Sequence, residues 1–288
     1  MICETAPAKI NLYLHVGPAR PDGLHALCSL FVFTEDGDSV SAEEASDISL
    51  TVGGPAAGAL ADLPPEENLI WKAAELLRAE CGVSKGAAIT LEKKLPVAAG
   101  IGGGSADAAA ALRALVKLWE LDIDDAALAK LAFRLGADVP ACLSGVPVNV
   151  AGAGEVLSPG PALPSLWACL VNPGVDMPTG PVFSGFDAAN PLPAAPAAPT
   201  LGEASYDALK QLMVQTRNDL QPAAEARAPE IAAVVAMLGQ SDGALAARMS
   251  GSGATCFGLF ATQADAERAA SKARMFGWWA MASRLILG

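Results

Sequence analysis

The sequence of 288 residues is poor in charge, and above all in positive charge. Charged residues make up 17% of it, and 19 lysines and arginines stand against 31 aspartates and glutamates, which gives a formal net charge of −12. A chain this acidic lacks the general electrostatic footprint of a protein that binds nucleic acid or an anionic membrane surface. Hydrophobic residues reach 52%, which excludes intrinsic disorder. The composition predicts a soluble globular protein with a sizeable core.

Targeting and membrane-spanning patterns are also missing. The first residues have neither the basic region nor the apolar stretch of a signal peptide. The charge-free run 156–175 contains four prolines, and a helix cannot span a bilayer through them. We therefore expect a cytoplasmic protein with no membrane partner and no nucleic-acid partner.

Metal-binding motifs are absent as well, and the small number of histidines disfavours hydrolase chemistry. The six cysteines are far apart in the sequence, no CxxC pair occurs, and His15 and His25 are the only histidines. This spacing argues against a zinc site and against a dense disulfide framework, and it predicts buried, reduced thiols. No HExxH motif is present, so the signature of a zinc protease is missing, and two histidines leave few candidate bases for a Ser/His/Asp hydrolase.

The apolar pattern that remains mixes strands and helices without strict alternation. Strands are predicted at 8–16, 29–34, 47–52, 87–91, 146–150, 166–171, 245–249, 255–260 and 279–287. Helices are predicted at 68–80, 106–120, 124–135, 206–214, 223–238 and 263–276, with a further helix start at 138–140. The Pro/Ala-rich tract 190–199 is expected to be a surface connection. The order predicts an α+β fold in two domains, residues 1–154 and 155–288.

A glycine-rich loop is the strongest local signal of chemistry. Glycines occupy four of the five positions 100–104, between a predicted strand and a helix that begins near Ser105. Glycine amides and a helix N-terminus together form a phosphate cradle. The alternative is a structural turn in which Ser105 is only the N-cap. The loop is neither a Walker A motif, because no Gly-Lys-Ser/Thr occurs, nor a complete dinucleotide fingerprint, because Ser105 stands at the third glycine position.

Three other features are ambiguous on their own. Lys9 stands beside an apolar strand-like run; it either pairs with a carboxylate or phosphate or extends its ammonium from a strand end into water. Asp138 is either a helix N-cap or a rigidly held carboxylate that accepts a hydroxyl proton. The Ser250-Gly251-Ser252-Gly253 segment is either an exposed loop that binds a charged ligand or a tight hairpin turn.

Taken together, these segments resemble three motifs of the GHMP small-molecule kinases, in the same order. The motifs are Ala6-Pro7-Ala8-Lys9-Ile10-Asn11-Leu12, Leu95-Pro96-x-x-x-Gly100-Ile101-Gly102-Gly103-Gly104-Ser105-Ala106 and Ser250-Gly251-Ser252-Gly253. Further similar segments are Asp22-Gly23-x-His25, Gly102-Gly103-Gly104-Ser105-x-Asp107-Ala108-Ala109, Gly136-Ala137-Asp138-Val139-Pro140 and Asn218-Asp219-Leu220. The resemblance covers nearly the whole chain. It implies a two-domain fold with the active site in the cleft between an N-terminal ATP-binding domain and a C-terminal α/β sandwich domain.

The resemblance also implies an activity and a set of site residues. The reaction would be transfer of the ATP γ-phosphate to the 2-hydroxyl of a cytidine diphosphate-linked methylerythritol, with Asp138 as general base and Lys9 assisting it. Matched ATP-binding positions are Asn68, Lys93 (or Lys94 in another register), Pro96, Gly100, Gly102, Gly103, Gly104 and Ser105. Matched substrate positions are Asn11, His25, Asp138, Thr179 and Phe183. Mg²⁺ is expected, although its ligands cannot be identified, and the choice between monomer and homodimer stays open.

Two departures from the family pattern stand out. Leu24 occupies a position that is usually an aromatic residue stacking on the cytosine, and loss of one stacking face is expected to cost about 1 kcal/mol or more. Ala98 and Ala99 replace glycines, a change expected to be tolerated. Two alternatives remain. Another GHMP kinase, such as a homoserine kinase, is disfavoured by the segments around His25 and Asp138, and a catalytically inactive homologue is disfavoured by the retention of Lys9 and Asp138.

Overall fold

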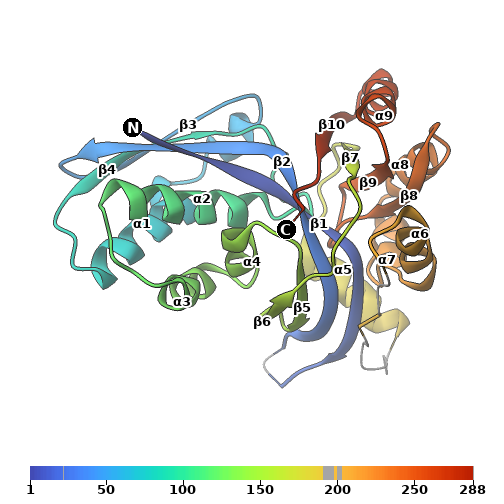
Figure 1. The fold of residues 1–288 in the computed structure, drawn as a ribbon, viewed down its shortest axis with the longest axis horizontal. Helices are drawn as coiled ribbons and strands as arrows, with labels where there is room; N and C mark the ends of the chain where they lie inside the picture. The colour runs from blue at the N-terminus through green and yellow to red at the C-terminus, as the bar shows by residue number, and fades with distance from the viewer. Residues whose placement is uncertain (22, 191–197, 200–202, 288) are drawn as a thin grey trace. The chain divides into compact units, whose positions relative to one another are not determined.

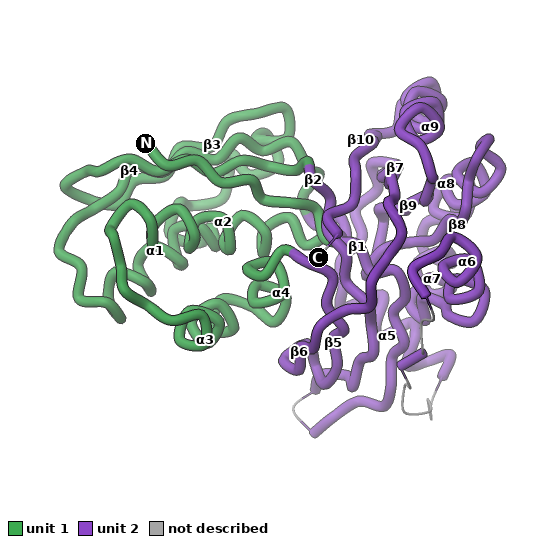
Figure 2. Tube along the Cα trace, in the orientation of Figure 1, with its two compact units in different colours: residues 1–9, 36–97, 102–145 green, residues 10–35, 98–101, 146–288 purple. Residues whose placement is uncertain are grey.

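The computed structural model describes residues 1–21, 23–190, 198–199 and 203–287. The chain forms two compact units and passes between them several times. Unit 1 comprises residues 1–9, 36–97 and 102–145, and unit 2 comprises residues 10–35, 98–101 and 146–288 (Figure 2). Two long strands, β1 (Ile2–Ala19) and β2 (His25–Ala45), contribute to both units.

Unit 1 is a sheet with helices gathered on one face (Figure 1). Its strand β4 (Gly86–Glu92) pairs antiparallel with residues 39–45 of β2 and parallel with β3 (Ile48–Gly53). The helices are α1 (Leu69–Glu80), α2 (Gly103–Leu118), α3 (Asp125–Leu135) and α4 (Val139–Ser144), with short 3₁₀ turns η1 (Ala57–Leu60) and η2 (Pro65–Glu67). Helix α2 is rich in alanine, and after a partly exposed first turn its residues 106–112 are all buried. Its small side chains let α1 and α4 pack closely against it.

Unit 2 contains strands from both ends of the sequence. Residues 27–31 of β2 pair with β5 (Val148–Gly152), which pairs with β6 (Val156–Pro159). A second, antiparallel sheet has the order β10 (Trp279–Arg284), β7 (Trp167–Asn172), β9 (Cys256–Phe260), β8 (Ala244–Met249). Helices α5 (Thr179–Ala189), α6 (Tyr206–Gln215), α7 (Gln221–Arg227), α8 (Glu230–Gly239) and α9 (Gln263–Met275) complete the unit.

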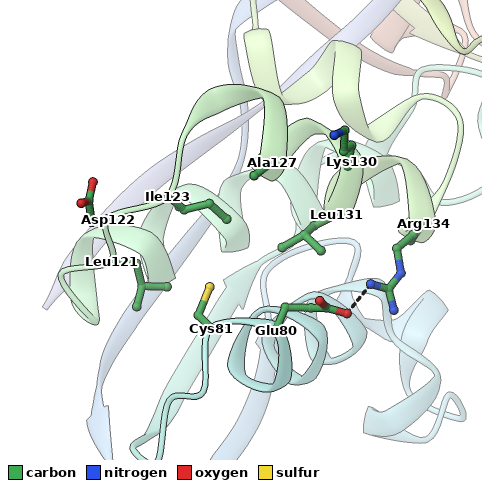
Figure 3. Close-up of a pocket in the computed structure, with 9 residues that line it drawn as sticks. All are labelled: Glu80, Cys81, Leu121, Asp122, Ile123, Ala127, Lys130, Leu131 and Arg134. Carbon is green, nitrogen blue, oxygen red and sulfur yellow. Dashed lines mark hydrogen bonds and ion pairs between the residues drawn. The ribbon is translucent and has the colours of Figure 1, made fainter.

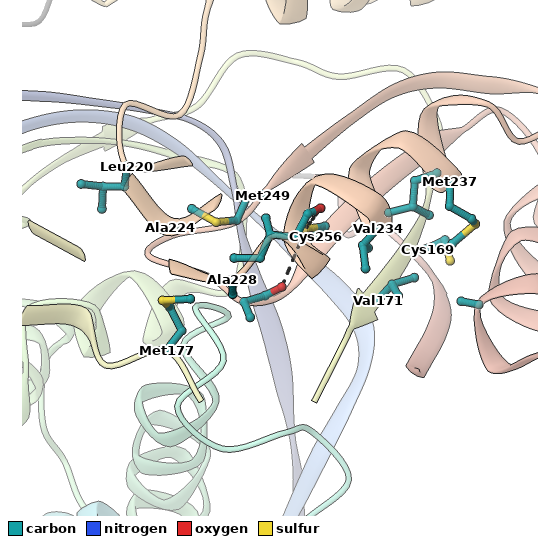
Figure 4. Close-up of a cluster of buried hydrophobic side chains, with 14 of the residues drawn as sticks. Cys169, Val171, Met177, Leu220, Ala224, Ala228, Val234, Met237, Met249 and Cys256 are labelled. Atoms are coloured by element: carbon teal, nitrogen blue, oxygen red, sulfur yellow. Dashed lines mark hydrogen bonds between the residues drawn. The ribbon is translucent and has the colours of Figure 1, made fainter. Parts of the chain in front are cut away.

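The core of unit 2 lies between this second sheet and its helices. Cys169 and Val171 of β7 and Cys256 of β9 share one buried cluster with Val234 and Met237 of α8 (Figure 4). Alanines of α9 belong to the same cluster, so α8 and α9 both pack on this face. The cluster anchors β8 and β9, whose connecting segment is the Ser250–Gly253 loop.

Most predicted elements are confirmed, but β1 and β2 are much longer than the predicted strands 8–16 and 29–34, and further corrections are needed. The predicted helix 223–238 is two helices, because Pro229 follows the extended residue Ala228 and interrupts the turn. Helix α2 begins at Gly103 rather than near residue 106. Helix α5 and strand β6 do not follow from the sequence pattern. All six cysteines are free, but Cys3 is exposed and Cys81 only partly buried, so the prediction of buried thiols fails there.

Two further expectations concern chain segments rather than elements. Most of the Pro/Ala-rich tract 190–199 lies outside the described residues, as does Asp22. Within the described ranges, no helix is long and apolar enough to cross a bilayer.

Candidate active site

An ion pair in unit 1 joins the two predicted catalytic residues. Lys9 lies on β1, and its Nζ is 3.2 Å from Oδ2 of Asp138. The lysine side chain is 5% exposed, whereas that of Asp138 is 35% exposed. Asp138 is the N-cap residue of α4, as one of the two interpretations predicts, but its side chain makes no capping hydrogen bond, so capping does not account for the carboxylate. A buried ammonium therefore holds a carboxylate that solvent and ligands can reach.

The start of α2 lies directly against Lys9. Gly102 is the N-cap with a left-handed φ of +64°, and a Cβ there would come within 3.1 Å of Lys9 Cε. Only glycine fits this contact without strain. Gly103, Gly104 and Ser105 form the first turn of α2, so Ser105 is not the N-cap. First-turn N–H groups have no acceptor within their own helix and carry the positive end of its dipole, which suits them to bind an anion.

A buried thiol lies beneath the same turn. A Cβ on Gly102 would lie 3.9 Å from Sγ of Cys142. Burial raises the pKa of the Cys142 thiol, and the nearby Asp138 carboxylate raises it further. Cys142 therefore stays protonated and adds no negative charge beneath the helix start.

The first part of the glycine loop, residues 98–101, packs within unit 2 against the Ser250–Gly253 loop. Gly100 has φ +74°, and a Cβ there would lie 2.5 Å from the backbone oxygen of Ser250. Ser250 Oγ donates to the Gly100 oxygen at 3.1 Å, and the Thr255 N–H donates to the Ala99 oxygen at 3.2 Å. Ser250 is fully buried, so the expectation of an exposed loop there is wrong. The loop is a hairpin connection that supports the glycine loop.

The two alanines that precede Gly100 fit this arrangement unequally. Ala98 takes φ +51°, a region that favours glycine and that costs other residues about 1–2 kcal/mol. Ala99 is buried and accepts the hydrogen bond from Thr255. The alanine at position 98 is therefore accommodated with some backbone strain.

Two of the predicted ATP-binding residues, Asn68 and Lys93, have partners within the protein. Asn68 Oδ1 accepts a hydrogen bond from the Ile70 N–H and caps α1. Lys93 is 2% exposed, and its Nζ lies 2.6 Å from both Asp38 and Asp107. Burial acts to lower the pKa of Lys93, but the two carboxylates outweigh it and raise that pKa. The side chain of Lys93 is thus enclosed by protein, while Pro96 is partly buried and Lys94 is exposed.

Apart from Asp138, which lies in unit 1, the predicted substrate residues lie in unit 2 and form two groups. The His25 ring lies 5.1 Å from the Phe183 ring, and its Nδ1 is 3.0 Å from the Gly17 oxygen. Its Nε2 faces Asp187 of α5 at 3.5 Å. In the second group, Ser250 Oγ accepts the Asn11 N–H at 3.1 Å. Thr179 begins α5, and its Oγ1 is 3.0 Å from Ser252 Oγ.

Several residues that contact these groups are not assigned a role by the sequence analysis. Asp38, Asp107 and Asp187 are among them, although Asp107 stands inside the glycine-loop motif. Asn218 donates to the backbone oxygens of Met249 and Gly251 at 2.9 and 2.8 Å. The Asn218-Asp219-Leu220 segment stands out as a motif, but only the fold shows that it holds the Ser250–Gly253 loop.

Two cavities among the described residues lie away from these groups or beside them. One, of about 580 Å³, lies between the end of α1 and α3 (Figure 3). It is lined by Glu80, Cys81, Leu121, Asp122, Ile123, Ala127, Lys130, Leu131 and Arg134. Another, of about 780 Å³, borders Phe186, Asp219 and Arg248 in unit 2. Neither is lined by Lys9 or Asp138, so the candidate site rests on the chemistry of its side chains and amides. Among the described residues, no group of three or more His, Cys, Asp or Glu side chains is arranged to hold a metal ion.

The chain matches two family models. Residues 68–146 match the N-terminal domain of the GHMP kinases, and residues 197–277 match the C-terminal domain of these kinases. The matches lie on either side of residue 154, where the sequence predicts a domain boundary; the exact division stays a prediction.

Similar proteins indicate which kind of GHMP kinase the chain resembles. The chain is 48% identical over 98% of its length to the 4-diphosphocytidyl-2-C-methyl-D-erythritol kinase of Paramagnetospirillum magneticum, covering 97% of that protein. It is 50% identical over 98% of its length to the kinase of the same name from Cereibacter sphaeroides, covering 98% of it. A crystal structure of 4-(cytidine 5'-diphospho)-2C-methyl-D-erythritol kinase superimposes with a TM-score of 0.81 at 34% identity, over 99% of this chain and 100% of that one.

A homoserine kinase from Cytophaga hutchinsonii has a TM-score of 0.73 at 19% identity, over 99% of this chain and 94% of that one. At that identity the likeness shows the fold alone. The chain belongs to the GHMP kinases and, within them, to the family of 4-diphosphocytidyl-2-C-methyl-D-erythritol kinases.

Proposed function

We propose that this chain transfers the γ-phosphoryl group of ATP to the 2-hydroxyl of 4-diphosphocytidyl-2-C-methyl-D-erythritol, a step of non-mevalonate isoprenoid synthesis. The observation that carries the proposal is the Lys9–Asp138 pair, whose Nζ–Oδ2 distance is 3.2 Å, directly beside the N-terminus of α2. The pair brings a proton acceptor and a cation next to an anion-binding helix start. The names of relatives about 50% identical along nearly the whole chain support the choice of substrate.

The different solvent exposure of Lys9 and Asp138 indicates a different role for each residue. Asp138 has the accessible carboxylate, so it takes the proton from the substrate hydroxyl as that oxygen attacks the phosphorus. Lys9 is held by β1 and the packed start of α2. It orients the carboxylate and stabilises negative charge on the transferred phosphoryl group. The first-turn amides of α2 bind the phosphates.

Recognition of the cytidine end is assigned to unit 2. The His25 and Phe183 rings form an aromatic pair, and Phe183 offers a face for the base. Leu24 is 54% exposed, so it supplies only a small apolar contact where an aromatic ring would stack. Asn11 and Thr179 are placed beside Ser250 and Ser252, where they complete the polar part of the substrate site.

The proposal also includes the phosphoryl donor, its metal ion and the cellular location of the protein. The donor is ATP with its Mg²⁺, and the phosphates supply most of the metal's ligands, since Mg²⁺ usually binds through one or two carboxylates plus phosphate oxygens. The partners are these small molecules, and the protein acts in the cytoplasm. Local cations and amides offset the net charge of −12, because both substrates are polyanions.

ADP release measured with ATP, Mg²⁺ and 4-diphosphocytidyl-2-C-methyl-D-erythritol tests the proposal. We expect turnover that depends on this substrate and that neither homoserine nor mevalonate replaces. Turnover with one of those alcohols instead would show a different GHMP kinase activity. ATP binding without turnover on any of them would show an inactive homologue.

A further inference from the structure

A buried group of three charges lies beneath the start of α2. Asp38 comes from β2, Lys93 directly follows β4, and Asp107 belongs to α2. Lys93 Nζ donates to Oδ2 of each carboxylate at 2.6 Å, and the three side chains are 0%, 2% and 5% exposed, in the order Asp38, Lys93, Asp107. We call Asp38, Lys93 and Asp107 the buried triad. It joins the sheet of unit 1 to the helix that begins at the glycine loop.

The backbone around Lys93 is as fixed as its side chain. The Lys93 N–H donates to the Gly53 oxygen at 2.8 Å, and the Lys93 oxygen accepts from the Ala56 N–H at 3.0 Å. The second carboxylate oxygen of Asp38 accepts the N–H groups of Lys94 and Leu95. The residues that lead into the glycine loop are therefore bound to β2 through the Asp38 side chain and to the end of β3 and the residues after it through backbone hydrogen bonds.

The ammonium of Lys93 touches the glycine loop from below. A Cβ on Gly103 would lie 3.1 Å from Lys93 Nζ, so residue 103 must be small for the helix start to rest on this cation. Asp107, one helical turn further on, binds the same cation. The Lys93 side chain thus contacts α2 at both ends of its first turn, at Gly103 and at Asp107.

This arrangement is not suited to a lysine that binds nucleotide. To reach a ligand, Lys93 would have to leave two buried carboxylates without a counter-ion, which costs several kcal/mol. We propose that Asp38, Lys93 and Asp107 are positioning residues that hold the first turn of α2 in the geometry that binds the triphosphate, and that Lys93 does not contact the nucleotide. The inference rests on the proposed function, because it concerns the same phosphate site.

Binding of MgADP, measured by calorimetry on the full chain, separates the two roles of Lys93. The variants are Lys93→Met, Asp107→Asn and the double variant. Lys93→Met leaves two carboxylates facing each other, so we expect the Kd for MgADP to rise tenfold or more, within the roughly 2- to 150-fold range of couplings between contacting residues. In the double variant, one carboxylate remains, Asp38, and two backbone N–H groups still satisfy it. We expect its Kd to return to within about threefold of the wild type.

A nucleotide-binding Lys93 predicts the opposite pattern. Both variants that lack the ammonium would then bind MgADP equally weakly, and that result overturns the proposal. If Lys93→Met alone does not fold, the double variant still decides whether Lys93 contacts the nucleotide. A matched control is Lys85→Met: Lys85 pairs with Glu44 at 2.8 Å across the other end of the same two strands, and both are about 60% exposed. Its Kd is expected to be unchanged.

A thermal unfolding scan of each variant tests whether the triad stabilises the fold without positioning the loop. If melting temperatures fall while every variant binds MgADP as the wild type does, the triad is only structural and the proposal fails. The outcome is separate from that of the substrate assignment. A wild type that binds MgADP but does not turn over 4-diphosphocytidyl-2-C-methyl-D-erythritol would refute the assigned reaction and leave the binding comparison among the variants intact.

Discussion

Replacing Asp138 by asparagine isolates proton transfer from everything else the residue does. Asparagine has the same shape and keeps an oxygen that accepts a hydrogen bond from Lys9, but it cannot take a proton at neutral pH. General-base catalysis contributes roughly 10²–10⁴-fold, so kcat should fall by about that factor, or about 2.7–5.5 kcal/mol in activation free energy. The KM values for both substrates should stay within about threefold, because the shape of the site is kept.

The stability cost of the same change is small. The Asp138 side chain is 35% exposed, so solvent screens its attraction to Lys9, and the loss should be about 1 kcal/mol or less. The melting temperature should then fall by no more than about 2–4 °C. Losing all turnover together with a collapse in stability would mean that Asp138 is structural.

Steady-state ADP release and a thermal scan on the same preparation provide the measurements. Asp124→Asn is the matched control. Asp124 is also a helix N-cap, but its Oδ1 does accept the Ala127 N–H at 2.7 Å, and asparagine caps a helix equally well. Its kcat should be unchanged. If Asp138→Asn keeps a kcat within tenfold of the wild type, the assignment of Asp138 as the base is refuted.

Three further changes test neighbouring parts of the argument. Gly100→Ala places a Cβ within 2.5 Å of the Ser250 backbone oxygen, at a residue with a left-handed φ. The substitution should lower the free energy of unfolding by about 2–4 kcal/mol. An unchanged denaturant midpoint would contradict the contact between the two loops. Leu24→Tyr restores a stacking face at a 54% exposed position and should lower the KM for the cytidine substrate about fivefold or more, whereas an unchanged KM would show that position 24 does not contact the base. Burial raises the pKa of Asp107 to about 7, a rise that Lys93 reduces and Asp38 increases. A carboxyl whose pKa is raised on folding loses its stabilising contribution as pH rises toward that value. The free energy of unfolding should therefore fall between about pH 4 and pH 7, and it should fall less in Asp107→Asn than in the wild type. If denaturant titrations give the two proteins the same slope of unfolding free energy against pH, Asp107 does not titrate in that range.

The elements that sequence predicts well are those whose signals are local. Helix α3 has a capping aspartate at Asp124 and ends at Gly136, and both bounds follow from the sequence. Helix α5 has no such signal, since Gly180 and Gly185 disfavour a helix and Pro181 is compatible with one only in its first turn. It forms because Val182 and Phe186 are buried in the core of unit 2, which is a tertiary contact that periodicity over eleven residues does not reveal.

In the candidate active site, too, contacts between residues far apart in the sequence are not predicted. The motifs correctly bring Lys9 beside Asp138 and His25 beside Phe183. They do not show that Ser250 is buried beneath the glycine loop, because that contact joins residues 150 positions apart. Nor do they assign Asp38, which is an ordinary aspartate in a long strand until β4 is paired with β2.

The two buried lysines of unit 1 show why residue type alone does not assign a role. Both lie under the start of α2, and a Cβ added at Gly102 or Gly103 would come within 3.1 Å of one of them. The carboxylate that pairs with Lys9 is partly exposed, so an oxygen remains to accept a proton from a substrate. The two carboxylates that pair with Lys93 are both enclosed, so that group is closed to a ligand. The accessible carboxylate, rather than the lysine, therefore distinguishes a catalytic pair from a group that holds the helix in place.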